Sequence, residues 1–442
     1  MLVPGPGTLL VGIRRGALLV APGEARLYKD HAFGHAKSNL RETHVKPHLE
    51  GGRCMRLPKL LAGLALASMV LAACGTTTGG TSNKGAIKIG VELPESGGET
   101  SNGIPTLNGV KFAVDQTKTV EGFTLSVANF DDAVNGVHDP QKGAQNVQQL
   151  VDDSKVLGMI GPFNSSVARA EIPISNRAHL VQISPANTNQ CLTKDIYIPQ
   201  SLSGVPDVDC KAAGYPFPKD LRPTGTNNYF RVATTDDFQG PAMSDYAYKT
   251  LNIKKVGVAS DAEAYGKGIA DTFTIRYQKD GGTVVKRQDF PNASKVSDFK
   301  PFLRAAQKAG AEAIYFGGTD SNNACVVRNQ MKAAGFADSA PFFGGDGIVT
   351  DKCKSDAAAA AVGMDGTVAT VAAEKVSGSQ ATIDAFKKAY PNSSDYGAYT
   401  MPAYDATKVL IAAIGRAIKA NNGNMPSRQQ VLDQMYKTDY TG

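Results

Sequence analysis

The amino-acid sequence predicts a mixed α/β protein with largely parallel sheets, and two features of the chain from residue 86 onward lead to this prediction. Short apolar segments such as 87–93, 156–160 and 255–260 alternate with segments of helical length and amphipathic character. Strands that are apolar throughout and separated by helices are typical of parallel sheets buried on both faces. Because ligands of such sheets bind beyond the carboxyl ends of the strands, the strand-to-helix loops are the candidate functional regions.

The expected elements follow one another as strand and helix through most of the chain. The expected strands are 87–93, 123–130, 156–160, 180–184, 230–233, 255–260, 282–290, 311–317, 340–344 and 367–371. The expected helices are 107–119, 140–151, one after 166, 238–251, 266–279, 298–309, 321–334 and 398–420. Residues 188–228 interrupt this order with Pro, Gly, Tyr and two Cys. A connection of that length is uncommon inside a domain, so we expect an insertion held by a disulfide.

The charge of the chain is unevenly distributed. The formal net charge is +6, and residues 1–73 contain ten of the 47 Lys/Arg but four of the 41 Asp/Glu, which accounts for the whole excess. The remainder is neutral and lacks the positive field that attracts nucleic-acid phosphates, so we expect no nucleic-acid binding. Its hydrophobic content and length suit a globular protein of two domains.

Residues 55–73 have the pattern of an export signal. Arg56 and Lys59 precede the apolar run 60–73, which is too short to span a bilayer and ends in small residues. The sequence Leu-Ala-Ala-Cys-Gly around Cys74 resembles a bacterial lipobox, so we expect cleavage before Cys74, acylation of its thiol and anchoring to the membrane. The alternative is an ordinary cleaved signal with a chance cysteine.

The segments on either side of this signal are also irregular. Residues 74–85 are rich in Gly, Thr and Ser, which predicts a flexible linker after the acylated cysteine. A signal begins near its Met, so we expect translation to start at Met55 and residues 1–54 to be a mistranslated upstream extension. The alternative is a real cytoplasmic extension.

The exported part of the chain contains four further cysteines: Cys191, Cys210, Cys325 and Cys353. Outside the cytosol an even number suggests disulfides, for which three connectivities are possible. Pairing of sequence neighbours is favoured because each pair brackets one irregular stretch. Zinc is the alternative, but no CxxC or HxxxH spacing is present in this exported part, and we expect neither a metal nor a cofactor.

Three small polar loops follow predicted strands: 161–166, 184–189 and 344–347. Ser165 and Ser166 begin a predicted helix, where free amides and the helix dipole favour a carboxylate; ordinary N-capping is the alternative. Thr188 offers a hydroxyl and an amide, or forms a simple turn. Asp346, between glycines, can accept an ammonium or form an Asx turn.

Other candidate residues give weaker signals. Tyr265 precedes a predicted helix and is either a pocket wall or a packing residue. His138 and His179, in a loop and at a strand edge, are interpreted as structural. The chain has no GxSxG elbow, phosphate-binding P-loop or GxGxxG turn after a strand, so we expect binding without catalysis.

At these loops the sequence resembles the type I periplasmic binding proteins, specifically the leucine/isoleucine/valine-binding receptors of ABC transporters. The resemblance runs from residue 87 to the C-terminus. It is carried by IKIGVELPESG at 87–97, LNGVKFAVD at 107–115, FDDAVNGVHDPQKGAQNVQQLV at 130–151, VLGMIGPFNSSV at 156–167, ISPANTN at 183–189, VGVASDAEAYGKG at 256–268, DFKPFLRAAQKAGAEAIYFGG at 298–318 and FFGGDG at 342–347.

The resemblance implies two Rossmann-like lobes with parallel sheets that are joined by a hinge and close on a ligand. Lobe 1 would comprise 86–235 plus 371–442, and lobe 2 would comprise 236–370. The family normally continues beyond residue 442, so we expect a truncated C-terminus.

The resemblance also implies a ligand site shared by both lobes. A ligand carboxylate would meet Ser165 and Ser166 together with the loop Ala186, Asn187 and Thr188. Its ammonium would meet Asp346, and Tyr265 would close over it.

Three positions of this implied site depart from the branched-chain receptors. Asn102 and Thr319 replace aromatic residues, and Asp346 replaces a longer Glu. The resemblance therefore leaves the ligand's side chain open, since relatives also bind amides, urea and aromatic acids.

The sequence as a whole predicts a monomeric, exported, lipid-anchored receptor on the extracytoplasmic face of the membrane. It would bind a small amino-acid-like ligand and deliver it to the permease subunits of an ABC importer. The alternatives are a ligand-sensing module for amides, urea or other small acids in a regulatory system, and an enzyme of α/β-hydrolase type.

Overall fold

A computed structural model describes residues 83–357, 363–372 and 379–439, together with the backbone of 9–14, 17–21 and 26–27. The predicted signal 55–73, Cys74 and most of the predicted linker lie outside these residues, as do residues 440–442 at the C-terminus. Among the residues that the structure describes, no helix is both long enough and apolar enough to cross a bilayer.

The first of two large sheets has six strands in the order β13-β10-β9-β4-β6-β5, all parallel except the edge strand β5. Its strands are β4 (Ala86–Leu93), β5 (Thr119–Val120), β6 (Phe123–Asp131), β9 (Val156–Ile160), β10 (Val181–Ser184) and β13 (Tyr229–Arg231). Neighbouring residues of β9 enter different cores: Leu157 and Ile160 belong to the core with Ile89, and Val156 and Met159 belong to the core with Leu150. The sheet is therefore buried on both faces, as the uniformly apolar strands predict.

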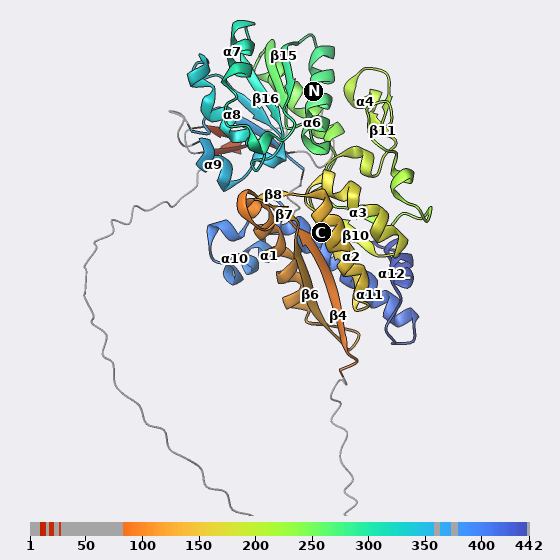
Figure 1. The fold of residues 1–442 in the computed structure, drawn as a ribbon. Helices are drawn as coiled ribbons and strands as arrows, with labels where there is room; N and C mark the ends of the chain where they lie inside the picture. Colours follow the sequence, from red (N-terminus) through yellow and green to blue (C-terminus); the bar gives the residue numbers. More distant parts are fainter. Residues whose placement is uncertain are drawn as a thin grey trace, which may run out of the picture. The chain divides into compact units, whose positions relative to one another are not determined.

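Helices cover both faces of this first sheet (Figure 1). They are α1 (Thr100–Thr117), α2 (Pro140–Asp152), α3 (Ser165–Arg177), α10 (Gln380–Ala389), α11 (Thr400–Ala420) and α12 (Arg428–Met435). Helices α1 and α11 pack closely because Gly109 has no side chain: a Cβ there would lie 2.1 Å from the Thr400 carbonyl oxygen. The C-terminal helices thus complete the fold around the N-terminal strands.

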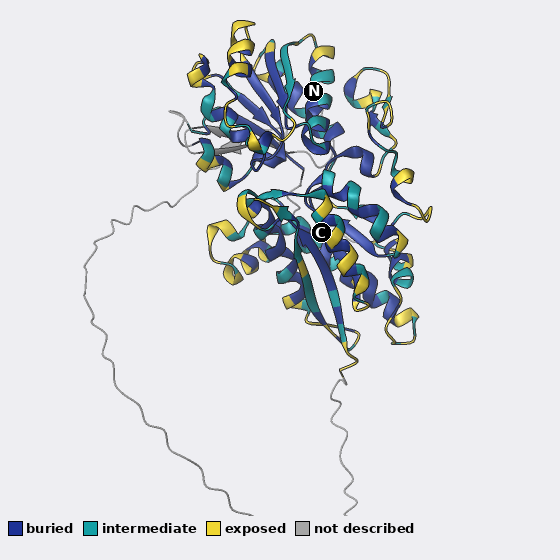
Figure 2. Cartoon of the chain, viewed as in Figure 1, coloured by how far each residue is buried: buried dark blue, intermediate teal, exposed yellow. Residues whose placement is uncertain are grey.

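The second sheet has the order β15-β14-β16-β17-β18-β1-β2-β3, and its first five strands are parallel. These five are β14 (Lys255–Ser260), β15 (Thr283–Asp289), β16 (Ala313–Gly317), β17 (Phe342–Gly344) and β18 (Thr367–Val371). In β16, Tyr315 stacks on Phe273 on one face, while Ile314 and Phe316 enter the opposite core. Figure 2 shows the inner strands of this sheet as buried, the edge strand β15 as mostly intermediate, and the outer surfaces of the helices as exposed.

The helices of the second sheet are α5 (Asp236–Asp245), α6 (Ala264–Lys279), α7 (Lys300–Lys308), α8 (Ala324–Gln330) and α9 (Asp351–Ala357). Helix α5 continues into a π-helical turn at Tyr246–Thr250, and a 3₁₀ turn at Lys332–Ala334 follows α8. The single helices expected at 238–251 and 321–334 are therefore each divided into two segments. Helix α1 begins seven residues before the predicted start at 107. The prediction missed its first turns because they are polar and show no apolar period.

The second sheet is extended by residues from the predicted upstream extension. Strands β1 (Leu9–Arg14), β2 (Ala17–Ala21) and β3 (Arg26–Leu27) form an antiparallel meander, and β1 pairs with β18. The start of translation at Met55 stays a prediction. A chain that began there would leave β18 without this partner strand.

The insertion at 188–228 contains little regular structure. It holds β11 (Ile196–Ile198), α4 (Gln200–Ser203), β12 (Val208–Asp209) and 3₁₀ turns at Gln190–Leu192 and Pro218–Leu221. A second small pair consists of β7 (Ala133–Val134) and β8 (Val137–His138).

Both predicted cysteine pairings are confirmed. The Cα atoms of Cys191 and Cys210 lie 5.7 Å apart in one disulfide, and those of Cys325 and Cys353 lie 5.2 Å apart in the other.

Candidate functional site

A pocket lies between the loops that follow the strands of the two sheets. The first sheet contributes Phe163, Asn164, Ser165, Ala186 and Thr188, and the second contributes Tyr265, Thr319, Asp346 and Gly347. The cavity volume of this pocket is about 10 Å³, about the space of one water molecule, so a larger ligand could enter only if the lobes moved apart. The position agrees with the rule that parallel sheets bind ligands beyond their carboxyl ends.

The wall from the first sheet presents hydroxyl groups and the start of a helix. Ser165 is the first residue of α3, and the side chain of the preceding Asn164 does not cap the helix amides. The Ser165 hydroxyl accepts a hydrogen bond from the Asn189 amide at 3.3 Å and retains its own proton to donate. Free amides, a hydroxyl donor and the helix dipole together favour a negatively charged group here.

The loop 184–188 forms the remainder of this wall. The Ser184 hydroxyl accepts from the amides of Ala186 and Asn187 at 3.2 and 2.9 Å, which fixes the loop. Thr188 faces the pocket, and its carbonyl accepts from the amide of Asp236, which begins α5. The first wall is therefore joined to the segment that crosses to the second sheet.

The wall from the second sheet is acidic. Asp346 follows β17 and begins a 3₁₀ turn. Its Oδ1 accepts from Gln239 Nε2 at 2.8 Å and from the Tyr265 hydroxyl at 3.1 Å, while Oδ2 accepts from the Tyr399 hydroxyl at 2.6 Å. Burial raises the pKa of Asp346, although these donors oppose the shift. The carboxylate is thus held in a fixed orientation at the edge of the pocket.

A second buried carboxyl group, that of Asp236, lies behind Asp346. Gln239 Nε2 also donates to Asp236 Oδ1 at 3.2 Å, so one amide bridges both carboxyl groups. Burial and then the charge of Asp346 raise the pKa of Asp236 well above its usual value. Two adjacent buried carboxyl groups disfavour double ionisation, and a cation in the pocket would relieve that repulsion.

A buried polar cluster joins the two sides next to this pocket. His138, in β8, lies with Nδ1 2.5 Å from Glu99 Oε1 and with Nε2 2.6 Å from Glu263 Oε2. Glu99 precedes α1 and Glu263 precedes α6, so the ring bridges both lobes. Ionised carboxylates only accept hydrogen bonds, which requires both ring nitrogens to carry protons.

The electrostatics of this His138 bridge favour the protonated ring. Burial disfavours the imidazolium, but Glu263 and Glu99 outweigh it and raise the pKa of His138 well above its usual value. Burial likewise opposes ionisation of Glu263, yet His138 lowers the pKa of this carboxyl. The structural role predicted for His138 is therefore more specific than ordinary packing.

Comparison with known proteins identifies the family of this chain. The family model described as "Periplasmic binding protein" matches residues 86–442. The chain belongs to the periplasmic binding protein family. Members of this family are substrate-binding receptors and not enzymes, and they act outside the cytoplasm.

Relatives of this periplasmic binding protein include amino-acid receptors. A Leu/Ile/Val-binding protein homolog from Brucella melitensis is 29% identical over 75% of this chain and 79% of its own. A leucine-, isoleucine-, valine-, threonine- and alanine-binding protein from Pseudomonas aeruginosa is 27% identical over 83% of this chain and 86% of its own.

A solved relative has the same fold. The leucine-binding protein LivK from Thermotoga maritima has a TM-score of 0.64 at 25% identity, over 80% of this chain and 88% of its own. The predicted fold of two lobes with parallel sheets is thereby confirmed.

The structure places most of the predicted ligand residues of this binding protein around one pocket: Ser165, Ala186, Thr188, Tyr265, Thr319 and Asp346. The others make contacts nearby. Ser166 donates to Glu263 Oε2 at 3.0 Å, and Asn102 Nδ2 donates to Asp320 Oδ1 at 3.1 Å, both across the lobes. Asn187 Nδ2 donates to the Phe163 carbonyl and fixes the loop.

Sequence reasoning missed several residues of the site. Phe163 and Asn164 line the pocket. They belong to the loop 161–166, which was already predicted as a ligand loop, so their position in the sequence could have identified them. Gln239 and Tyr399 hold Asp346, but both lie within predicted helices and not in the polar loops that were singled out. No local pattern distinguishes them from other polar residues at helix starts. Within the described ranges, no group of His, Cys, Asp or Glu is arranged to hold a metal ion.

Proposed function

We propose that this chain is the receptor of an ABC importer for a small α-amino acid or a closely related zwitterion. The observation that carries the proposal is the opposite polarity of the two pocket walls. The start of α3 with Ser165 suits a carboxylate, and Asp346 suits an ammonium group. The Pseudomonas aeruginosa relative named for five amino acids supports this class of ligand.

The two charges of such a ligand would drive closure of the lobes. A zwitterion that bridges the walls satisfies both poles only when the lobes are together. It therefore binds the closed state more tightly, and this difference in affinity shifts the population toward closure. The cross-lobe bonds of Tyr399 to Asp346 and of His138 to Glu263 would stabilise the same state.

The side-chain end of the ligand is proposed to be small or polar rather than large and apolar. Thr319 lines the pocket, and its hydroxyl lies 2.8 Å from that of Ser321, which donates to the buried Glu99 at 2.6 Å. Threonine or alanine would suit this polar environment better than a bulky aliphatic residue, since burying polar groups against an apolar side chain costs hydrogen bonds.

A thermal-shift panel tests the proposed ligand class. The full chain would be heated with L-threonine, L-alanine, L-valine, L-leucine, urea, acetamide and benzoate, each over a concentration series. A ligand at 100-fold its Kd adds about 2.7 kcal/mol of stability. We expect saturable stabilisation by at least one zwitterion. Stabilisation by benzoate or urea alone would overturn the proposal.

Membrane attachment is a separate part of the proposal. Acylation of Cys74 by two chains would give stable anchoring, whereas one chain is marginal. Cys74→Ala is expected to move the protein from the membrane fraction to the soluble exported fraction, with Thr77→Ala in the predicted linker as the matched control. Unchanged fractionation of Cys74→Ala would contradict lipid anchoring and leave the ligand proposal unaffected.

A further inference from the structure

The insertion between β10 and β13 contacts the lobe opposite to the sheet from which it emerges. We call residues 190–221 the strap. In its centre Tyr197 and Tyr215 stack with ring centroids 5.1 Å apart and form one buried cluster with Ala264 of α6. The Tyr197 hydroxyl donates to Asp271 Oδ2 at 3.0 Å, and α4 also contacts α6. The strap is therefore fastened along α6 of lobe 2.

The two ends of the strap are fixed to lobe 1. Leu192 and Leu221 pack against Ile172 of α3 in a separate buried cluster. The Arg222 guanidinium donates to the Leu192 carbonyl at 2.8 Å and so joins these two ends. The strap thus connects α3, whose first residue lines the pocket, with α6, whose second residue lines it from the other lobe.

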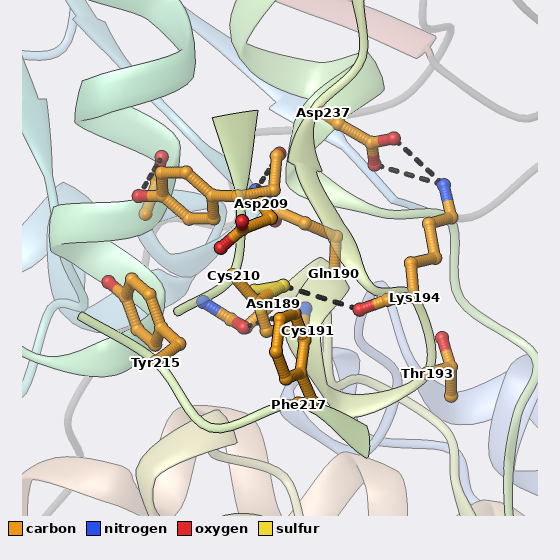
Figure 3. Close-up of a disulfide and its surroundings, with 12 residues drawn as sticks. Asn189, Gln190, Cys191, Thr193, Lys194, Asp209, Cys210, Tyr215, Phe217 and Asp237 are labelled. Atoms are coloured by element: carbon orange, nitrogen blue, oxygen red, sulfur yellow. Dashed lines mark hydrogen bonds and ion pairs between the residues drawn. A yellow bond between two sulfur atoms is a disulfide. The ribbon is translucent and has the colours of Figure 1, made fainter. Parts of the chain in front are cut away.

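The disulfide closes the strap close to the site. Cys191 and Cys210 lie beside Asn189, whose Oδ1 accepts from the Cys191 amide at 3.0 Å (Figure 3). Lys194, three residues after Cys191, pairs with Asp237 Oδ2 at 2.8 Å in the first turn of α5. Asp237 is buried, so this ion pair fixes the strap to the segment that connects the lobes.

Two donors from this region converge on one carbonyl. Asn189 Nδ2 donates to the Ala264 oxygen at 2.7 Å, and the Tyr215 hydroxyl donates to the same oxygen at 3.4 Å. Tyr265 is the next residue. Its hydroxyl donates to Asp346 Oδ1 at 3.1 Å and accepts from the Gly347 amide at 3.0 Å. Because Tyr265 follows Ala264 directly, movement of the Ala264 backbone would displace the Tyr265 ring and weaken both hydrogen bonds of its hydroxyl.

We propose that the disulfide-closed strap is a positioning element that sets the start of α6 and thereby places Tyr265 against Asp346 in the pocket. This inference rests on the proposed function, because it assigns a role in ligand binding. The strap residues are positioning residues that do not line the pocket themselves. Loss of the strap contacts should therefore free Tyr265, loosen the lobe 2 wall and speed ligand release.

The competing interpretation is a simple stabilising clip, and the second disulfide provides a matched control for it. Cys325–Cys353 closes a loop of comparable length, with a sequence separation of 28 against 19, and lies in the lobe 2 core away from α6. Removing either disulfide should lower Tm. Only removal of the strap disulfide, and not removal of Cys325–Cys353, should alter the start of α6.

Hydrogen–deuterium exchange of the full chain tests the inference without any ligand. In the double variant Cys191→Ser/Cys210→Ser, amide exchange over residues 264–270 is expected to rise at least tenfold. Tyr215→Phe, which keeps the packing and the disulfide, should raise it about threefold. Cys325→Ser/Cys353→Ser should leave this segment unchanged whatever its Tm. Equal exchange in wild type and both strap variants, or an equal rise in the control, overturns the inference.

Titration calorimetry with L-threonine and L-alanine supplies the binding readout. If either binds wild type, the strap variants should bind at least tenfold more weakly, while the control double variant keeps the wild-type Kd. Wild-type affinity in the strap variants would overturn the inference. If neither amino acid binds wild type, the proposed function fails for these ligands, and the exchange result alone decides the role of the strap.

Discussion

The two walls of the pocket arise from the same kind of loop but have different chemistry. The wall from the first sheet offers the start of α3 and the hydroxyls of Ser165 and Thr188, which carry no charge. The wall from the second sheet offers Asp346 with Asp236 behind it. Repetition of a strand-to-helix unit therefore gives two equivalent positions, and a few side chains make one suited to an anion and the other to a cation.

The largest expected effect comes from neutralising the acidic wall. Asp346→Asn keeps the size of the side chain but removes its charge, and truncating one partner of a buried charge pair costs about 2–5 kcal/mol. We expect the affinity for an amino acid to fall at least ~100-fold by titration calorimetry, since ~2.7 kcal/mol corresponds to that factor. Asp351→Asn, at the exposed start of α9, is the matched control. Equal affinity of wild type and Asp346→Asn would show that this wall does not bind the ammonium.

A smaller effect is expected from the uncharged wall. Ser165→Ala removes one hydroxyl donor but leaves the helix amides, and a hydrogen bond to a charged group contributes about 1.5–3 kcal/mol. Amino-acid affinity should fall at least ~10-fold, while binding of the corresponding amine, which lacks the carboxylate, stays unchanged. A loss of the same size for the amine would place the carboxylate elsewhere in the pocket.

The pairing of the walls should depend on pH through His138. Its pKa is raised in the folded protein, so its stabilisation is complete below the unfolded value of about 6.5 and is lost as pH rises through the raised pKa. Burial also raises the pKa of Asp320 to about 7, so the contribution of Asp320 to stability likewise falls as pH rises toward 7. Tm should therefore fall by at least ~2 °C between pH 6 and 8.5.

The matched variant for this pH effect is His138→Gln. Its Tm should be lower at pH 6 and should change less between pH 6 and 8.5 than that of wild type. His179→Gln is the control, because the described structure shows no hydrogen bond of His179 Nδ1 and no ion pair of His179 with a carboxylate. A pH dependence in His138→Gln as steep as in wild type would show that His138 does not cause the change in Tm.

The smallest expected effect concerns the side-chain end of the pocket. Thr319→Val preserves shape but removes the hydroxyl that faces Ser321. Because one neutral hydrogen bond contributes about 1 kcal/mol, the ratio of affinities for L-threonine and L-valine should fall about fivefold. An unchanged ratio in calorimetry would mean that Thr319 does not distinguish these isosteric ligands.

Local sequence patterns predicted the framework of the site but not its supports. Ser165 and Asp346 follow apolar strands, so their place at one edge of each sheet followed from the alternation of strand and helix. Tyr399 and Gln239 hold Asp346 from helix starts far along the chain, and only the packed fold brings them there. The partners of His138 were hidden for the same reason, since a lone histidine says nothing about which carboxylates will face it.

The insertion shows the same limit on a larger scale. Its cysteine pairing was predictable because Cys191 and Cys210 bracket one irregular stretch. Its packing on α6 was not, because Tyr197 and Tyr215 lie in segments without a helical or strand period. Long-range contacts of irregular segments depend on shape, which a sequence pattern does not encode.

The most direct test of the two-walled pocket compares three ligands by titration calorimetry on the wild-type chain. They are the amino acid that stabilises the chain most in the thermal-shift panel, its amine without the carboxylate, and its acid without the ammonium. We expect the complete zwitterion to bind at least ~100-fold more tightly than either half, because only the zwitterion satisfies both walls. Binding of the amine or the acid alone as tightly as the amino acid would contradict this expectation.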